Sequence, residues 1–248
     1  MTPRLPAGLR ALLRPVGAPV LRHVRLQAGA RRLAGLLAEE GEFGGLFDAV
    51  FAEETFRPLQ NRAEFVGLME RCAAVRPRRL REIGTAAGGT AFLWTRVAEE
   101  DALVILVDRE MDFSRRAAFR RFARGRQRVV CIAGESRAAR TLAAVGAALA
   151  GAALDVLFID GDHRYEGVTA DLACYAPLVR PGGIIAFHDV VPDHRVRFGN
   201  QAGNDSGEVY RLWRELKERF PGRTEEFVDD PEQDGAGIGI LTWPGGGL

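Results

Sequence analysis

The sequence predicts an α/β protein with a mostly parallel sheet that helices cover on both faces. Two observations predict this fold class. Short apolar runs alternate with longer amphipathic stretches from residue 80 onward, which is typical of parallel sheets with two buried faces. A glycine-rich turn at residues 84–89 also joins the first apolar run to a helical stretch. In open α/β sheets such a turn forms one wall of a ligand pocket.

The individual elements follow from periodicity and from chain-breaking residues. A helix is expected from Arg62 to Ala74, where apolar side chains recur with helical spacing until Pro77 stops it. The segment Gly41–Gly45 precedes this helix and predicts a bend or loop. The stretches between the apolar runs are long enough for crossover helices. Parallel strands are expected at residues 80–83, 103–107, 129–133, 156–159 and 184–187.

The end of the chain shows a different pattern. After a helix at about Glu208–Phe220, two strand candidates, Glu226–Val228 and Gly237–Leu241, follow each other with a fairly short link. Strands with a short link form a hairpin, in which they run in opposite directions. One strand at this end of the sheet is therefore expected to be antiparallel.

Composition excludes several classes of protein. The chain of 248 residues is 47% hydrophobic with a formal net charge of +1, so it can bury a full core and lacks a general attraction to nucleic acid. No apolar run reaches the roughly 20 residues of a membrane span. Three scattered cysteines predict reduced thiols rather than a disulfide framework. We expect a cytoplasmic protein without a nucleic-acid partner, and a homo-oligomer is compatible with this composition.

The first 54 residues differ from the rest. They contain no acidic residue before Glu39, and arginines occur among leucine, valine and alanine at roughly helical spacing. We expect residues 1–54 to form a basic helical extension and residues 55–248 to form the main domain. The pattern also fits an organelle-targeting peptide or an amphipathic helix in peripheral contact with a membrane. The arginines are Arg4, Arg10, Arg14, Arg22, Arg25, Arg31 and Arg32.

Polar residues follow each expected parallel strand where its apolar run stops. In an open parallel sheet the ligand lies beyond these carboxyl ends, near the point where the strand order reverses. We expect Asp108 to accept hydrogen bonds from ribose hydroxyls, whereas Ser136 could equally cap a helix. The residues at the strand ends are Glu82 and Gly84, Asp108, Gly134-Glu135-Ser136, Asp160-Gly161-Asp162-His163, and His188-Asp189.

The glycine spacing separates two classes of cofactor. A nicotinamide or flavin fingerprint requires glycines two and then three residues apart, so that the backbone approaches a pyrophosphate. Ala86 occupies the second of these positions, and Glu82 would place a negative charge beside a diphosphate. A cofactor with a cationic amino-acid end would instead be attracted. An NAD(P)-dependent oxidoreductase is kept as an alternative, as is a non-catalytic protein that binds a nucleoside cofactor.

These segments resemble the class I S-adenosylmethionine-dependent methyltransferases. Glu82-Ile83-Gly84 with Gly88-Gly89-Thr90 is similar to their first motif, and residues 157–168 and 181–189 resemble the small-molecule O-methyltransferase branch described as cephalosporin hydroxylase-like. The resemblance covers about Gln60 to Leu241. It implies a Rossmann-like, doubly wound, mostly parallel seven-stranded sheet and S-adenosyl-L-methionine as cofactor. The residues that it implies for cofactor binding are Glu82, Gly84, Thr85, Gly88, Asp108, Arg109, Glu135, Ser136 and Asp160.

The resemblance also implies a candidate metal site and a reaction. In metal-dependent relatives, carboxylates after the fourth and fifth strands bind magnesium, and Asp160, His188 and Asp189 occupy those places. An imidazole does not suit Mg²⁺, so a softer divalent cation is the alternative. The implied catalytic residues are Asp160, His163, His188 and Asp189. Each histidine is either a general base or a structural anchor.

The expected reaction is methyl transfer to an oxygen, less favourably a nitrogen, of a small molecule such as a sugar or a natural-product intermediate. Because the nucleophile must lie in line with the methyl group, positioning supplies much of the catalysis. The long polar stretch 190–207 directly follows the last of these strand ends and predicts a substrate lid. Within it, Arg195 and Arg197 could bind an acidic group of the acceptor.

Overall fold

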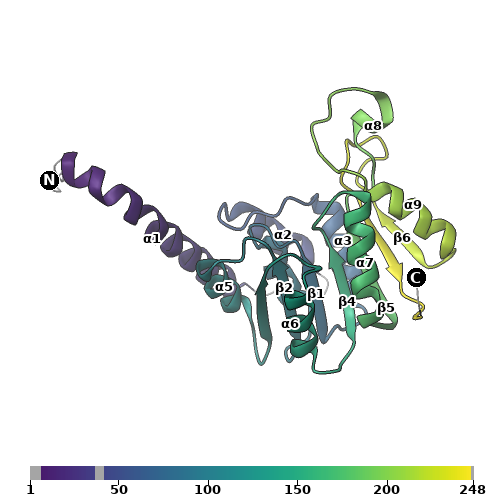
Figure 1. Ribbon diagram of the computed structural model, residues 1–248, viewed down its shortest axis with the longest axis horizontal. Coiled ribbons are helices and arrows are strands. Elements are labelled where there is room, and N and C mark those ends of the chain that lie inside the picture. The colour runs from purple at the N-terminus through teal and green to yellow at the C-terminus, as the bar shows by residue number, and fades with distance from the viewer. Residues whose placement is uncertain (1–6, 37–41, 247–248) are drawn as a thin grey trace.

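The computed structural model describes residues 7–36 and 42–246 and has a seven-stranded sheet at its centre (Figure 1). The strands are β1 (Arg79–Ile83), β2 (Leu103–Asp108), β3 (Arg128–Ala133), β4 (Leu154–Ile159), β5 (Val179–His188), β6 (Thr224–Phe227) and β7 (Ile238–Thr242). Their order is β3-β2-β1-β4-β5-β7-β6. Strands β1 to β5 are parallel, and β7 is antiparallel to both of its neighbours. The predicted fold class is confirmed.

Helices cover both faces of this sheet (Figure 1). Because side chains alternate between the two faces of a strand, each face has its own hydrophobic cluster, one against α1 to α5 and the other against α6, α7 and α9. The helices are α1 (Ala7–Ala34), α2 (Phe43–Ala52), α3 (Arg62–Ala73), α4 (Gly89–Val97), α5 (Phe113–Phe119), α6 (Ala139–Leu149), α7 (Tyr165–Tyr175), α8 (His194–Phe198) and α9 (Val209–Arg219), with short 3₁₀ turns at Arg120–Phe122 and Ala176–Leu178.

Aromatic packing fixes the position of α3 and α4 on the sheet. Phe65 of α3, Trp94 of α4 and Phe158 of β4 are fully buried, and their ring centroids lie 5.2 to 5.9 Å apart. These separations lie in the range of favourable aromatic pairs. The contact holds α4, which follows the glycine-rich turn, against β4.

The strand order reverses between the neighbouring strands β1 and β4. From β1 the chain adds β2 and β3 on one side, then returns to place β4 and β5 on the other. A crevice forms where two neighbouring strands lead their connections to opposite sides. Gly84 follows β1 and Asp160 follows β4, so both lie at this switch point.

The N-terminal helix α1 extends away from the body of the molecule (Figure 1). Its C-terminal part packs against the domain, where Leu26, Ala30 and Leu33 are buried. Arg22 forms an ion pair with Asp112 near the start of α5. No helix within the described ranges has the length and apolar character of a membrane span. Of the seven arginines noted in this segment, Arg4 lies outside the described residues.

The prediction of a bend or loop at Gly41–Gly45 is wrong in part. Gly41 lies outside the described residues, but α2 begins at Phe43 and includes both following glycines. Phe43, Leu46, Phe47 and Val50 are buried at helical spacing in the same core as the sheet. This burial outweighs the low helix propensity of glycine, which costs about 1 kcal/mol per residue. The division of the chain at residue 54 stays a prediction.

Candidate functional site

A cavity of about 820 Å³ opens at the carboxyl ends of the parallel strands. Its walls come from the turn after β1, the ends of β2 to β5, and the segments 57–60 and 204–205. Eleven of the twelve residues predicted for binding or catalysis line it, so the structure brings them together as the strand-end argument expected. They are Gly84, Thr85, Gly88, Asp108, Arg109, Glu135, Ser136, Asp160, His163, His188 and Asp189.

The glycine-rich turn forms one wall of the cavity. We call this turn, together with Asp108, Arg109, Glu135 and Ser136, the turn side. Gly84 has a φ of 81°, and a Cβ built on it would lie 1.8 Å from the carbonyl oxygen of Asp160. Only glycine combines this left-handed backbone with such a close approach. Gly84 therefore lets β1 and β4 end side by side at the floor of the cavity.

Asp108 accepts three backbone hydrogen bonds at the end of β2. Its Oδ2 accepts from the amides of Thr85 and Ala86 at 2.9 and 3.0 Å, and its Oδ1 accepts from the amide of Glu110 at 2.7 Å. A carboxylate offers about four acceptor sites. Asp108 thus braces the turn through three of these acceptor sites. About one site is left to accept a hydrogen bond from a ribose hydroxyl.

The segment after β3 supplies the far end of the turn side. Arg109 and Glu135 form an exposed ion pair at 3.3 Å across the cavity rim. Ser136 is buried and donates to Asp171 Oδ1 at 2.5 Å, while the hydroxyl of Tyr175 donates to its carbonyl oxygen. The residue at the N-cap of α6 is Ala138. Ser136 therefore anchors its segment to α7 rather than capping α6.

Glu82 is the predicted residue that does not line the cavity. Its side chain points to the opposite side of β1 from Ile83, is fully buried, and accepts a hydrogen bond from Trp94 Nε1 at 3.0 Å. Burial raises the pKa of Glu82 to about 8, although hydrogen bonds from Thr90 and Trp94 act in the other direction. Strand alternation turns this side chain toward α4 and out of the cavity lining. The expected contact of Glu82 with a cationic cofactor end stays a prediction.

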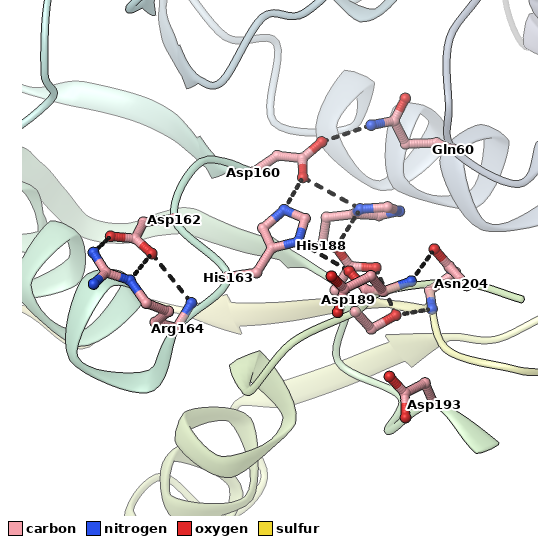
Figure 2. A network of polar contacts seen from close by, with 12 residues as sticks. Gln60, Asp160, Asp162, His163, Arg164, His188, Asp189, Asp193 and Asn204 are labelled. Atoms are coloured by element: carbon pink, nitrogen blue, oxygen red, sulfur yellow. Dashed lines mark hydrogen bonds and ion pairs between the residues drawn. The ribbon is translucent and has the colours of Figure 1, made fainter. Parts of the chain in front are cut away.

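Across the cavity, four ionisable residues form the histidine–aspartate cluster (Figure 2). His188 Nδ1 lies 3.3 Å from Asp160 Oδ1 and 3.2 Å from Asp189 Oδ2. His163 contacts the same two carboxylates, with Nε2 3.5 Å from Asp160 Oδ1 and Nδ1 3.2 Å from Asp189 Oδ2. The side chain of His163 is 36% exposed and that of His188 is 8% exposed. Both histidines line the cavity, and His163 is the more exposed of the two.

Mutual attraction sets the protonation of this cluster. Burial disfavours charge on Asp160, but the charge of His188 and hydrogen bonds from both histidines hold the pKa of Asp160 well below its usual range. Hydrogen bonding to Asp160 raises the pKa of His163 to about 9 against the effect of burial. Burial lowers the pKa of His188, yet the charge of Asp160 outweighs it and leaves this pKa well above its usual value. Both histidines therefore carry a proton on each ring nitrogen, and so a positive charge, at neutral pH.

The nitrogen and oxygen atoms of this cluster could also ligate a divalent cation. Ligand atoms of Asp160, His163 and Asp189 all lie within 4.8 Å of one another. The sequence-based set had His188 in place of His163, and both imidazoles contact both carboxylates. A mixture of nitrogen and oxygen ligands is typical of manganese, iron, cobalt or zinc rather than magnesium.

Two further contacts of the cluster were missed by the sequence argument. Gln60 donates from Nε2 to Asp160 Oδ2 at 2.6 Å (Figure 2). Ser206 donates from Oγ to Asp189 Oδ1 at 2.9 Å and accepts from the amide of Ala236 at 2.7 Å. Neither residue follows a parallel strand, so a rule based on strand ends could not find them.

The stretch 190–207 lies beside the cavity but is tied down. Asp234 accepts from the amides of His194 and Gly203 at 2.6 and 2.5 Å. Asn204 and Asp205 line the cavity, whereas the two arginines expected to meet the acceptor do not. Arg195 pairs with Asp193 and Asp205, and Arg197 pairs with Glu232. Their guanidinium groups hold the segment together instead.

A family model described as a methyltransferase domain matches residues 81–190, which carry the turn and all four cluster residues. The sheet order and the glycine-rich turn agree with that match. The chain has the class I methyltransferase fold. The match leaves out the segment 57–60, which contributes to one wall of the cavity.

Solved structures of methyltransferases share this fold. An O-methyltransferase from Bacillus cereus in complex with SAH is 18% identical, with a TM-score of 0.57 over 84% of this chain and 93% of that one. TomG from Streptomyces achromogenes, an O-methyltransferase of tomaymycin synthesis in complex with SAM, is 17% identical with a TM-score of 0.56 over 90% and 99%.

A third structure adds a metal. The MycE methyltransferase of the mycinamycin pathway, in complex with Mg and SAH, is 21% identical with a TM-score of 0.53 over 82% of this chain and 56% of that chain. A sequence search of curated proteins finds no match. At these identities the likeness concerns the fold, and the chemistry must be argued from the cavity itself.

Proposed function

We propose that this methyltransferase domain transfers a methyl group from S-adenosylmethionine to an oxygen of a small molecule. One observation carries the proposal. The glycine-rich turn with Asp108 and the histidine–aspartate cluster face the same cavity. A site for a nucleoside cofactor and a site for proton removal therefore adjoin at the switch point of the sheet.

The turn side supports the choice of cofactor. The cofactor supplies, when bound, an electrophilic methyl group on a sulfonium. Asp108 has limited acceptor capacity for ribose hydroxyls, and Glu135 and Ser136 border the far end of the cavity, where the resemblance expects adenine. Structures that share the fold are in complex with SAM or SAH. Residue 86 is alanine with a φ of 42° where a dinucleotide fingerprint has glycine, which does not favour the oxidoreductase alternative.

The cluster side supports oxygen as the acceptor atom. We assign His163 as the general base that takes the hydroxyl proton at Nε2 while the oxygen bonds to the methyl carbon and the carbon–sulfur electron pair leaves with sulfur. His163 is the more exposed of the two histidines, and His188 lies behind it against Asp160 and Asp189. Because Nε2 must be unprotonated to act, His163 first releases its Nε2 proton to solvent and keeps the proton on Nδ1, which faces Asp189.

A divalent cation is a proposal of its own. Asp160 and Asp189 would hold it with one imidazole as the nitrogen ligand. Such an ion would orient the acceptor oxygen and lower the pKa of its hydroxyl. If chelation abolishes methyl transfer and Mn²⁺ restores it better than Mg²⁺, the ion is part of the site. Unchanged transfer after chelation assigns proton removal to His163 alone.

The test of the proposed function uses the full chain. Calorimetry compares S-adenosylhomocysteine with NADH, and mass spectrometry then follows transfer of a methyl-d3 group to a panel of hydroxylated and amino-substituted sugars and phenols. Binding of the first ligand and a mass gain on a hydroxyl support the proposal. Binding of NADH alone would favour an oxidoreductase, and cofactor binding without transfer to any acceptor would favour a non-catalytic binding protein.

For the N-terminal segment we propose a peripheral contact with an anionic surface. Val20, Leu21 and Val24 are 57%, 61% and 56% exposed on α1, and the helix contains arginines but no acidic residue. This combination is typical of helices that lie in a membrane interface. Co-sedimentation with phosphatidylglycerol vesicles tests it, with phosphatidylcholine vesicles as the control. A dimer by light scattering without vesicle binding would assign the same face to a second copy.

A further inference from the structure

The buried position of Glu82 leaves one part of the proposed cofactor without the partner that the sequence had offered. The amino-acid end of S-adenosylmethionine carries an ammonium group, which needs acceptors in the cavity wall. The side chain of Glu82 does not line the cavity, and its Oε1 accepts from Trp94 beneath the turn. An acceptor must therefore come from another residue close to the turn and Asp160.

Gln60 has the required position. It lines the cavity, is 7% exposed, and reaches Asp160 Oδ2 with Nε2 at 2.6 Å. The segment before it crosses the start of α4, since a Cβ at Gly89 would lie 2.1 Å from the carbonyl oxygen of Phe56 and 2.9 Å from Pro58 Cδ. We call residues 56–60 the strap. It lies over the end of the turn at which the amino-acid part of the cofactor is expected.

One atom of Gln60 is left without a partner. Its Oε1 is buried and makes no hydrogen bond, whereas Nε2 is committed to Asp160. A buried acceptor that makes no hydrogen bond costs about 1–3 kcal/mol, and that of Gln60 belongs to a side chain that lines the cavity. A ligand that donates a proton would satisfy it. The orientation of the amide is also fixed, because the Asp160 carboxylate can only accept.

We propose that Gln60 and Asp160 together recognise the ammonium group of the cofactor's amino-acid end. This inference rests on the proposed function and assigns a specific subsite within it. The ammonium donates to Gln60 Oε1 and to the Asp160 carboxylate, and the strap thereby links cofactor binding to the residue that also contacts both histidines. Recognition of this end of the cofactor thus depends on a segment that the methyltransferase family model does not cover.

The test compares two ligands that differ only by the amino-acid end. Calorimetry measures the affinity of S-adenosylhomocysteine and of 5′-methylthioadenosine, which keeps the nucleoside and the sulfur, for the full-length wild type and for Gln60→Met. We expect the variant to bind S-adenosylhomocysteine about 10- to 100-fold more weakly, as for loss of a hydrogen bond to a charged group, and to bind 5′-methylthioadenosine within about twofold of the wild type. Gln60→Asn, which is too short to span both partners, should show the same selective loss.

The matched control is Gln127→Met. Gln127 lies just before β3, is 8% exposed, donates to backbone carbonyls at the C-terminal end of α4, and does not line the cavity. Unchanged affinity of Gln60→Met for S-adenosylhomocysteine, or an equal loss for both ligands, would overturn the ammonium role. If the wild type binds neither ligand, the proposed function itself fails. If it binds both equally well, the cofactor site stands and this inference alone is wrong.

Discussion

On the turn side of the cavity, backbone groups make most of the contacts, whereas on the cluster side ionisable side chains make them. Asp108 is bound by three backbone amides, and Gly84 touches a backbone carbonyl. In the histidine–aspartate cluster, each histidine contacts both carboxylates through its ring nitrogens. Figure 2 shows Asp162 and Arg164 paired with each other, apart from this cluster.

The difference separates what the fold requires from what the reaction requires. A backbone-built wall depends on a few glycines and is insensitive to the protonation of neighbours, so it suits a ligand common to many proteins of one fold. A wall of coupled charges responds to a proton, a cation or a bound hydroxyl. We therefore expect changes on the turn side to affect stability and cofactor affinity, and changes in the cluster to affect turnover.

The largest effect is expected for Gly84→Ala on the turn side. The new Cβ would meet the Asp160 carbonyl oxygen at 1.8 Å in a left-handed backbone. Strain and overpacking together should destabilise the fold by about 3–5 kcal/mol and abolish binding of S-adenosylhomocysteine. Chemical denaturation and calorimetry measure both. The control is Gly146→Ala in α6, where nothing lies within 4 Å. A stable Gly84→Ala protein that binds cofactor would refute the backbone account.

Replacement of His163 by alanine tests the cluster side. We expect turnover to fall about 10²- to 10⁴-fold, as for loss of a general base, with little change in cofactor affinity. Steady-state kinetics and calorimetry separate the two readouts. His194→Ala is the control, because His194 belongs to α8 and does not line the cavity. Equal losses of turnover and cofactor affinity in His163→Ala would remove the division between the two sides.

Asp108→Ala should affect both stability and binding. Loss of the carboxylate leaves the amides of Thr85 and Ala86 without their acceptor, and we expect affinity for S-adenosylhomocysteine to fall by about 1.5–3 kcal/mol. Asp112→Ala is the matched control, since Asp112 caps α5 through the Arg115 amide. It should cost about 1 kcal/mol of stability without a change in affinity. An unchanged affinity in Asp108→Ala would remove Asp108 from the cofactor site.

The smallest effect is expected for Glu82→Gln beneath the turn. In the fold burial raises the pKa of Glu82 to about 8 from an ordinary value of 4.5, so the folded chain keeps a proton that the unfolded chain has released. Stability from this group is complete below about pH 4 and is lost as the pH rises through 8. The glutamine variant should therefore gain about 1–2 kcal/mol over the wild type at pH 9 relative to pH 7.

Urea denaturation at the two pH values measures this gain. Glu100→Gln serves as the control, because the Glu100 side chain is 75% exposed. A variant whose advantage over the wild type does not depend on pH would show that Glu82 is ionised throughout, and it would return this carboxylate to the groups that a cationic ligand can attract.

The sequence was sufficient for the sheet and for most of the cavity. Strand ends follow from apolar runs, and parallel strands bring their carboxyl ends to one edge, so strand order alone places Asp108, Asp160 and His188 together. The sequence did not show which way Glu82 points, because the direction of a side chain depends on strand parity and on the helix above it. Trp94 lies twelve residues later and decides that direction.

Other parts were beyond sequence reasoning because they depend on long-range packing. Gln60 meets Asp160 across one hundred residues of sequence, and no spacing rule connects them. The roles expected of Arg195 and Arg197 failed because nearby carboxylates satisfy both guanidinium groups. The pattern of arginines in a polar stretch does not reveal which partner they have. The helix at Phe43 was missed because burial of its aromatic residues overrode two glycines.

The strap at residues 56–60 has a consequence for how such a protein can change over time. A pocket wall that stands outside the family-matched stretch 81–190 can be exchanged by recombination upstream of β1 while the catalytic strands stay intact. A hybrid gene that joins a foreign segment to residue 79, where β1 begins, would inherit the glycine turn and the histidines, yet would lose Phe56, Pro58 and Gln60. The contact that we propose for Gln60 can thus change while the turn and the histidine–aspartate cluster stay the same.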